Sequence, residues 1–261
     1  MKLVQCKTAA SPSGLPGLDW AVNPYRGCSH ACAYCYAQDV TRFHMDRPWG
    51  ETIEVKFNIV QKLKSQLQKN AKGVFGVGTV TDPYQSLEKK FELTRGCLVA
   101  LKSAGAQISV LTKSDLILRD LDVLRAWQSA EVGISIASLD GETAALLEPG
   151  APSPDRRLDA LRRLSAEGVR TYLMAAPIIR GVTDSEEGLR GLVRRSNEAG
   201  VRAIMWDKFN PKPMATSRLR KRLVEKGFSQ TTVHSNNELT RIRSVLGSEC
   251  EKLGLELLDA F

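Results

Sequence analysis

From residue 73 onward, short β-prone runs alternate with amphipathic, helix-prone segments. The predicted strands lie at residues 74–80, 107–112, 132–137, 171–175 and 203–206, and the predicted helices at 87–103, 120–129, 155–167, 185–199 and 217–226. Several strand runs are apolar without polar alternation, which indicates burial on both faces. Repeated βα units with such strands predict a parallel sheet with right-handed crossovers.

The number of these units limits the architecture. One further strand before Cys28 brings the count to about six βα units, fewer than the eight of a closed barrel. We therefore predict an α/β fold of the partial (β/α)6 barrel type, followed by a C-terminal helix at 235–253. Chemistry in parallel α/β folds gathers at the carboxyl ends of the strands, so polar residues that follow a strand are candidate site residues. Trp206, Asp207 and Lys208, at the end of the sixth strand, are such candidates for contact with a substrate.

We divide the chain into three parts. Residues 1–22 are expected to form an irregular lead-in, because 11–17 are rich in proline, glycine and serine. Residues 23–234 would form the barrel, and residues 235–261 a helical extension packed on it. A chain of 261 residues buries enough surface to fold without disulfides.

Charge and hydropathy narrow the range of partners. The chain has 37 Lys and Arg against 29 Asp and Glu, a net charge of +8, and basic proteins tend to meet phosphates. In the most basic predicted helix, Arg218 and Arg222 share one face. This face could form a phosphate-facing stripe or could simply be solvated, and both alternatives are open.

No apolar run approaches the roughly 20 residues of a membrane span, and no secretory signal precedes the fold. A cytoplasmic location without membrane contact is therefore expected.

Three of the six cysteines form a compact motif. Cys28, Cys32 and Cys35 have the spacing C-x3-C-x2-C. In a reducing compartment such a trio indicates a ligand set or a redox set rather than a disulfide framework. Three thiolates on one loop can each bind one iron of a cubane cluster, which leaves the fourth iron open to a substrate as in catalytic metal sites.

Two other uses of these cysteines stay open from the residues alone. His30 or His44 could complete a zinc site, because C-x2-C is a common zinc half-site, and the protein would then be a zinc-stabilised nucleic-acid-binding module. A conventional electron-transfer cluster would need Cys6 or Cys97 as its fourth ligand. Cys97 lies in an apolar helical stretch, however, and is expected to fill the core.

The pattern Gly-Cys-x3-Cys-x-Tyr-Cys-Tyr-Ala-Gln at residues 27–38 resembles the radical S-adenosylmethionine (SAM) superfamily, and in particular its spore photoproduct lyase-like branch. The likeness continues in order through residues 79–85, 111–114, Ser135, 148–149 and 177–184. It therefore spans most of the predicted barrel. The resemblance implies a [4Fe–4S] cluster and SAM as cofactors.

The resemblance also implies roles for individual residues. Cys28, Cys32 and Cys35 would hold the cluster, with SAM on the fourth iron. The implied SAM contacts are Tyr34 beside the cluster and the adenine, Thr81 and Asp82 at the amino group, Lys113 at the carboxylate or ribose, Ser135 at a ribose hydroxyl, and the backbone of Pro177 and Ile178 at the adenine. All of these lie at or just past a predicted strand end except Ser135, which falls within a predicted strand.

The reaction follows from the same resemblance. A flavodoxin- or ferredoxin-type protein would supply one electron, SAM would be cleaved reductively, and the resulting 5′-deoxyadenosyl radical would remove a hydrogen atom from the substrate. A nucleic acid, as a DNA lesion or an RNA modification site, fits the branch and the basic helix. A small molecule or a peptide side chain fits the compact size of the chain.

One departure from the branch concerns hydrogen donation. Spore photoproduct lyase uses an additional cysteine near the end of the second strand, whereas residues 76–85 of this chain contain none. Repair of thymine-dimer-type lesions by that route is therefore not expected. Tyr36 and Tyr84 are the candidates for relaying a hydrogen atom instead.

Overall fold

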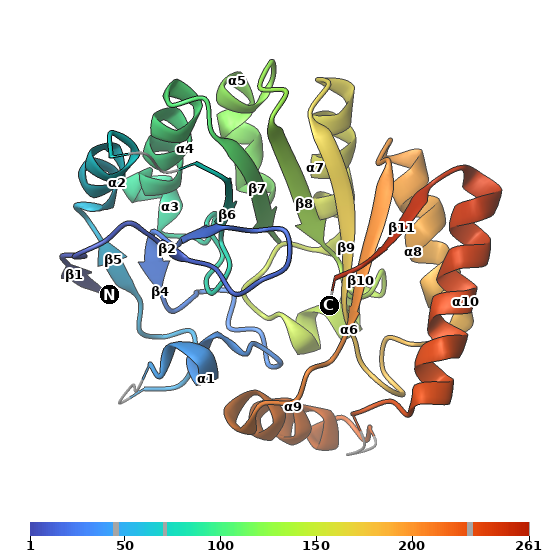
Figure 1. Cartoon of the computed structure of the whole chain (residues 1–261). Helices are drawn as coiled ribbons and strands as arrows, with labels where there is room; N and C mark the ends of the chain where they lie inside the picture. Colours follow the sequence, from blue (N-terminus) through green and yellow to red (C-terminus); the bar gives the residue numbers. More distant parts are fainter. Residues whose placement is uncertain (44–46, 70–71, 229–231, 261) are drawn as a thin grey trace.

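A curved, mostly parallel sheet is the framework of the protein (Figure 1). The computed structural model describes residues 1–43, 47–69, 72–228 and 232–260. The sheet has the strand order β11-β10-β9-β8-β7-β6-β3-β2. Its strands are β2 (Ala10–Pro12), β3 (Trp20–Val22), β6 (Val74–Val77), β7 (Gln107–Thr112), β8 (Ala130–Ser135), β9 (Arg170–Ile178), β10 (Ala203–Lys208) and β11 (Glu256–Asp259). All neighbouring pairs are parallel except β2 with β3, which confirms the predicted α/β class.

Helices cover the outer face of this sheet (Figure 1). They are α2 (Ile59–Leu67), α3 (Glu88–Phe91), α4 (Leu93–Ser103), α5 (Leu121–Leu124), α7 (Pro154–Ala166), α8 (Glu186–Glu198) and α10 (Asn236–Leu253). Fully buried side chains such as Val110 and Ile134 on the strands pack against Leu101 and Leu161 on the helices. Successive residues of β9 divide between this core and a second apolar cluster that contains Tyr172.

The remaining elements gather at the carboxyl ends of the strands. The arrowheads of β7 and β8 point toward α1 (Ala37–Thr41), α6 (Gly141–Leu147) and α9 (Pro213–Glu225) (Figure 1). A small sheet of β1 (Lys2–Val4), β5 (Glu54–Lys56) and β4 (Tyr25–Arg26) lies beside them, and β4 leads directly into the cysteine motif. Within the described ranges, no helix is long and apolar enough to cross a membrane.

Some predicted elements differ in detail. The single helix expected at 87–103 is two helices, α3 and α4, which meet at Glu92 with φ of 48°. The Glu88 carboxylate accepts the backbone N–H of Thr94 at 3.0 Å and that of Arg95 at 3.3 Å, so it caps α4 and explains the break. The helix expected at 120–129 is a 3₁₀ turn, η1 (Asp115–Asp120), followed by the one-turn α5.

Strand pairs cross both proposed domain boundaries. Residues 1–22, expected as an irregular lead-in, supply β3, which pairs in parallel with β6. Residues 235–261 contain α10 but also β11, which pairs in parallel with β10 and extends the sheet beyond the six predicted units. The first and last segments are therefore joined to the sheet by backbone hydrogen bonds.

One helix carries a charge on its buried face. Arg157 of α7 is 1% exposed and shares that face with Leu158 and Leu161. Its Nη1 lies 2.5 Å from Oε2 of the equally buried Glu148 and donates to the carbonyl of Ser135 at 3.0 Å. A buried charge is tolerated only when it is paired and hydrogen-bonded, and removing one partner leaves the other uncompensated.

We expect Arg157→Met to destabilise the protein by about 3 kcal/mol or more, because it leaves the buried Glu148 carboxylate without its paired cation. The matched control is Arg156→Met. This neighbouring side chain is 62% exposed and pairs with Asp115 at the surface, so the free energy of unfolding should fall by less than about 1 kcal/mol. Urea unfolding of both variants measures the difference. Adding Glu148→Gln to Arg157→Met should recover part of the loss, whereas equal losses for the two arginine variants would contradict this account.

Candidate cluster and cofactor site

The three motif cysteines lie on one loop beyond the strand ends. This cysteine loop, residues 27–36, connects β4 to α1. Cys28 is 6% and Cys32 7% exposed, Cys35 is half-buried, and all three are free thiols. Burial raises the pKa of the Cys28 thiol and raises that of Cys32 to about 12, so an isolated thiolate is disfavoured there. A bound metal centre deprotonates such thiols, and the donor set therefore fits an iron–sulfur cluster.

The other ligands considered from the sequence are placed differently. His30 is buried, and its Nδ1 lies 3.2 Å from Oδ2 of Asp82. His44 lies outside the described residues. In the part of the chain that the structure describes, no three His, Cys, Asp or Glu side chains converge on a single metal-ion position. A cubane cluster does not require such convergence, because each of its thiolates binds a different iron.

At two glycines, the backbone of the cysteine loop packs closely against another backbone segment. Gly27 has φ of 82°, and a Cβ there would overlap the carbonyl oxygen of Thr52. Gly150 approaches the loop from the other side: its N–H donates to the carbonyl of His30 at 3.0 Å, and a Cβ would overlap the carbonyl oxygen of Ser29. Close approach of this kind requires glycine, so both positions fix the path of the loop.

Thr81 also forms a hydrogen bond with the cysteine loop. Its Oγ1 donates to the carbonyl of Gly27 at 2.7 Å and accepts from Nε2 of Gln85 at 3.0 Å. The threonine is 7% exposed. The hydroxyl expected to meet the amino group of SAM is therefore already engaged with the loop backbone.

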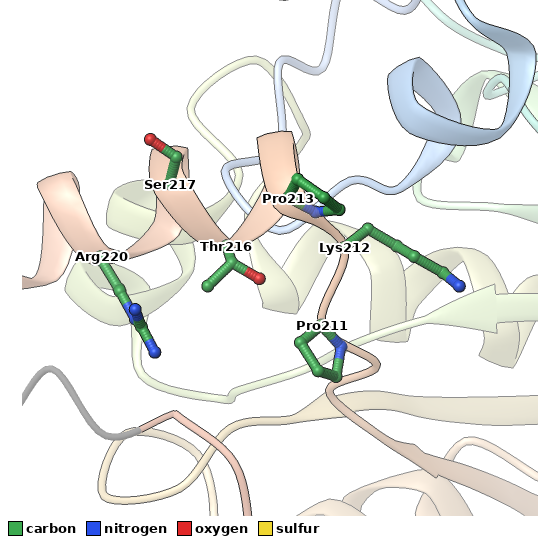
Figure 2. A pocket seen from close by; sticks show the side chains of 6 residues that line it. All are labelled: Pro211, Lys212, Pro213, Thr216, Ser217 and Arg220. Carbon is green, nitrogen blue, oxygen red and sulfur yellow. The ribbon is translucent and has the colours of Figure 1, made fainter.

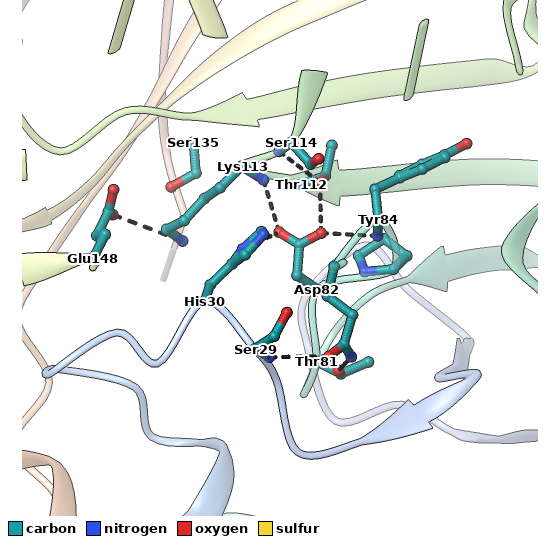
Figure 3. A network of polar contacts seen from close by, with 12 residues as sticks. Ser29, His30, Thr81, Asp82, Tyr84, Thr112, Lys113, Ser114, Ser135 and Glu148 are labelled. Carbon is teal, nitrogen blue, oxygen red and sulfur yellow. Dashed lines mark hydrogen bonds and ion pairs between the residues drawn. The ribbon is translucent and has the colours of Figure 1, made fainter. Parts of the chain in front are cut away.

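Asp82 is the centre of a buried polar network (Figure 3). Its Oδ1 accepts from the hydroxyl of Thr112 at 2.6 Å and from the N–H of Tyr84 at 2.9 Å, and its Oδ2 accepts from the N–H of Lys113 at 2.8 Å and contacts His30. Burial alone would raise the pKa of Asp82, but the His30 ring and these hydrogen bonds lower it below its usual range. These partners hold the Asp82 side chain in a fixed position, and its contact with the amino group of SAM stays a prediction. Asp82 ties the cysteine loop to the end of β7.

Lys113, Tyr34 and Glu148 form a second network at the strand ends. The Lys113 ammonium lies 4.0 Å from Oε1 of Glu148 and 5.5 Å from the centre of the Tyr34 ring. The Tyr34 hydroxyl donates to the same carboxylate oxygen. Burial lowers the pKa of Lys113, but the nearby Cys32 and Glu148 outweigh it and raise the pKa, so the side chain stays cationic. A cation beside the cysteine loop suits the carboxylate of a bound SAM.

The other implied SAM contacts lie on two neighbouring strands. Ser135 is the last residue of β8 rather than a mid-strand residue, which places it with the other candidates at the carboxyl ends. Its Oγ donates to the carbonyl of Ala176 at 3.3 Å. Pro177 and Ile178 end β9, and their carbonyls accept from the Thr183 hydroxyl at 3.3 Å and the Phe209 N–H at 2.9 Å.

The two tyrosines expected to relay hydrogen lie in different environments. Tyr36 precedes α1, is 39% exposed, and donates its hydroxyl to the carbonyl of Thr79 at 2.7 Å. The ring of Tyr84 turns away from the cysteine loop (Figure 3), is 1% exposed, and donates to Asp120 at 3.0 Å. Tyr84 is therefore a buried core residue, and this placement does not favour the expected role in relaying a hydrogen atom. Only Tyr36 stays accessible near the loop.

Asp207, near the end of β10, lies within electrostatic reach of Tyr36. Burial raises the pKa of Asp207 to about 6, partly offset by the neighbouring Lys208. Its Oδ2 accepts from Nδ2 of Asn210 at 2.7 Å. The carboxylate therefore stays a candidate for substrate contact.

The structure corrects the expected orientation of the basic helix. Arg218 does not face solvent: it donates to Oε1 of Gln38 at 2.6 Å and to the carbonyl of Cys35, and its guanidinium lies 5.5 Å from the Trp49 ring centre. Arg222 donates to the carbonyl of Leu146 at 3.3 Å. These two arginines therefore form neither the phosphate-facing stripe nor the solvated face that the sequence left open, because both turn inward toward the cysteine loop and α6.

Sequence reasoning missed Glu148 as the hub of the site, together with Arg157, although residues 148–149 belong to the resemblance. One signal was present for Arg157. It occupies an apolar position in the pattern that contains Leu158, Leu161 and Leu164, and a charge at such a position indicates a buried partner. The partner itself cannot be identified by helical spacing, because Glu148 lies before the start of α7.

Comparisons with known proteins agree with this geometry. The Radical SAM superfamily profile matches residues 22–193. An uncharacterised protein of Methanocaldococcus jannaschii is 37% identical over 183 residues, which cover 70% of this chain and 69% of that protein. An uncharacterised protein of Mycobacterium bovis is 34% identical over 213 residues, covering 77% of this chain and 62% of that protein. The radical SAM Nα-GlyT isomerase of Pseudomonas phage M6 is 25% identical over 179 residues, covering 68% and 36%.

Solved structures show the same fold. A mutant of spore photoproduct lyase with bound AdoMet and dinucleoside spore photoproduct superposes with a TM-score of 0.74 at 18% identity, covering 99% of this chain and 81% of that one. At this identity the likeness concerns the fold. The match of the superfamily profile over more than half of the chain carries the assignment. The chain therefore belongs to the radical SAM superfamily, and its cofactors are a [4Fe–4S] cluster and SAM.

Proposed function

We propose that this radical SAM enzyme holds its cluster on Cys28, Cys32 and Cys35 and acts on a nucleotide unit of a nucleic acid. The observation that carries the cluster assignment is the set of three buried or half-buried free thiols on one loop at the carboxyl ends of the strands. Lys113 supplies a cation beside that loop. Tyr34, itself in the loop, packs in one apolar cluster with Cys32, and its ring centre lies 5.5 Å from the Lys113 ammonium.

When bound on Cys28, Cys32 and Cys35, the cluster would supply the electron for reductive cleavage of SAM, and the 5′-deoxyadenosyl group so released would remove a hydrogen atom from the substrate. The residues of the protein bind SAM and orient it. Lys113 would hold the carboxylate of SAM, and Ser135 with the backbone of Pro177 and Ile178 would hold its nucleoside portion. The buried surroundings of Tyr34 exclude water from this region, which protects a reactive species from side reactions.

Two observations support the nucleic acid substrate. The fold is that of spore photoproduct lyase, whose structure contains a dinucleoside ligand, and this chain carries a net charge of +8. A flavodoxin- or ferredoxin-type protein is the proposed electron donor. Binding of single-stranded DNA and of tRNA across a salt series tests the substrate class, because phosphate contacts are lost steeply as salt rises. Absence of binding at low salt would exclude a nucleic acid.

Cys32→Ala should abolish both cluster assembly and SAM cleavage, because one of three cluster ligands is lost. The measurement is anaerobic reconstitution with iron and sulfide, followed by dithionite, SAM and an assay for 5′-deoxyadenosine. Cys97→Ala is the matched control: that thiol is fully buried in the main core, so its loss should cost on the order of 1 kcal/mol of stability and leave the cluster intact. A cluster-loaded Cys32→Ala protein that still forms 5′-deoxyadenosine would refute the ligand assignment.

Lys113→Met should weaken SAM binding roughly tenfold to hundredfold, because a charge-assisted hydrogen bond of about 1.5–3 kcal/mol is lost. Isothermal titration calorimetry of SAM into the oxidised, cluster-loaded protein measures this without turnover. Lys89→Met, at an exposed position of α3, serves as the control and should bind SAM like the parent protein. An unchanged dissociation constant for Lys113→Met would show that Lys113 does not contact SAM.

A further inference from the structure

The outward side of α9 carries polar side chains at regular spacing. Lys212, at the start of the helix, Thr216 and Arg220 follow one another at intervals of four residues, so they lie on one side of the helix. Lys212 and Arg220 are exposed and Thr216 is half-buried. Together with Pro211, Pro213 and Ser217 they line an open hollow at the surface (Figure 2).

The chemistry of this hollow suits an anion. Lys212 and Arg220 supply positive charge, Thr216 and Ser217 supply hydroxyl donors, and none of the six lining residues is acidic. Some surface arginines are paired, as Arg156 is with Asp115. Over the residues that the structure describes, neither Lys212 nor Arg220 forms an ion pair. The two cations are therefore available to an external ligand.

The spacing suits a ligand with several phosphates. Lys212 and Arg220 are eight residues apart, which is about 12 Å along a helix axis at about 1.5 Å per residue. One strand of a duplex carries a phosphate for each ~3.4 Å of axis, so this distance spans about three or four phosphates. The two cations can accordingly contact separate phosphates of one strand.

The opposite side of α9 contacts the candidate site. Arg218, opposite Thr216 and Arg220 on the helix, donates to the carbonyl of Cys35. At the first turn of α9, the Asp39 carboxylate accepts the N–H of Met214 at 2.9 Å and that of Ala215 at 3.2 Å. The width of one helix, about 10 Å, thus separates the outer hollow from the cysteine loop. A strand held in the hollow lies close enough to the site to present a neighbouring nucleotide there.

We propose that Lys212, Thr216 and Arg220 bind the phosphodiester backbone of a nucleic acid strand and orient it toward the site beside the cysteine loop. This inference rests on the proposed nucleic acid substrate and extends it to a defined surface. Since phosphates carry no base information, this surface contributes affinity and register, and the choice of base is left to the site.

The test is the double variant Lys212→Gln with Arg220→Gln, in cluster-loaded protein. Binding of a fluorescent single-stranded DNA, and of an RNA of the same sequence, is measured between ~50 and ~200 mM KCl. Loss of two phosphate contacts should weaken binding roughly tenfold at low salt and reduce the slope of log K against log salt by about 1.4, at ~0.7 per contact. The two oligonucleotides show which kind of strand supplies the phosphates.

The matched control is Lys62→Gln with Lys64→Gln, which removes two exposed charges from α2, on another side of the molecule (Figure 1), and should keep affinity and slope. Iron content and thermal unfolding verify that each variant is folded. If the parent protein binds neither oligonucleotide, the proposed substrate class fails. If the parent binds and the α9 variant binds equally well, this surface is wrong while the substrate class stands. Unchanged oligonucleotide binding with slower cluster reduction by an acidic flavodoxin would assign the hollow to the electron donor and overturn the inference.

Discussion

The buried carboxylate of Glu148 organises the charges at the strand ends. It contacts the guanidinium of Arg157, the ammonium of Lys113 and the hydroxyl of Tyr34. Arg157 is the closer cation and already balances the charge of Glu148, so the three charged groups together carry one net positive charge. That charge resides on Lys113, whose side chain is 18% exposed against 1% for Arg157 and for Glu148. The buried ion pair thereby holds a further cation at the strand ends, where the proposed contact with the carboxylate of SAM would form.

The cysteine loop is fixed by protein groups on both sides. Thr81 and Gln85 hold the carbonyl of Gly27, and Gly150 passes close to His30. Most of these contacts are to backbone atoms, so they set the path of the loop without depending on its side chains. The cysteine side chains therefore stay free for ligation, and the supporting contacts supply the rigidity that a precise ligand geometry needs.

The parallel α/β fold was predictable from the sequence because hydrophobic periodicity and strand burial are local properties. The cysteine motif was equally visible, since its spacing is short. Features that depend on distant contacts were not predictable: the Glu88 carboxylate breaks the predicted helix at Glu92, and β11 is only four residues long. The same reason explains why the network around Asp82 was not predicted. Its partners His30 and Thr112 are 52 and 30 residues away, and only the fold brings them to the same carboxylate.

The attachment of α9 to the cysteine loop has a thermodynamic consequence. Asp39, which follows the cysteine motif, accepts from the backbone of α9, and Arg218 of α9 donates to the carbonyl of Cys35 in the motif. The order of the helix and the order of the motif segment therefore depend on each other. Two equilibria that share a structural element are coupled reciprocally, with the same free energy in both directions. Any free energy with which ligands of the loop stabilise α9 through these contacts is therefore returned as tighter ligand binding when α9 is stabilised by another contact. Cluster binding on the cysteine loop and the proposed binding of a strand on α9 would therefore influence each other through these contacts.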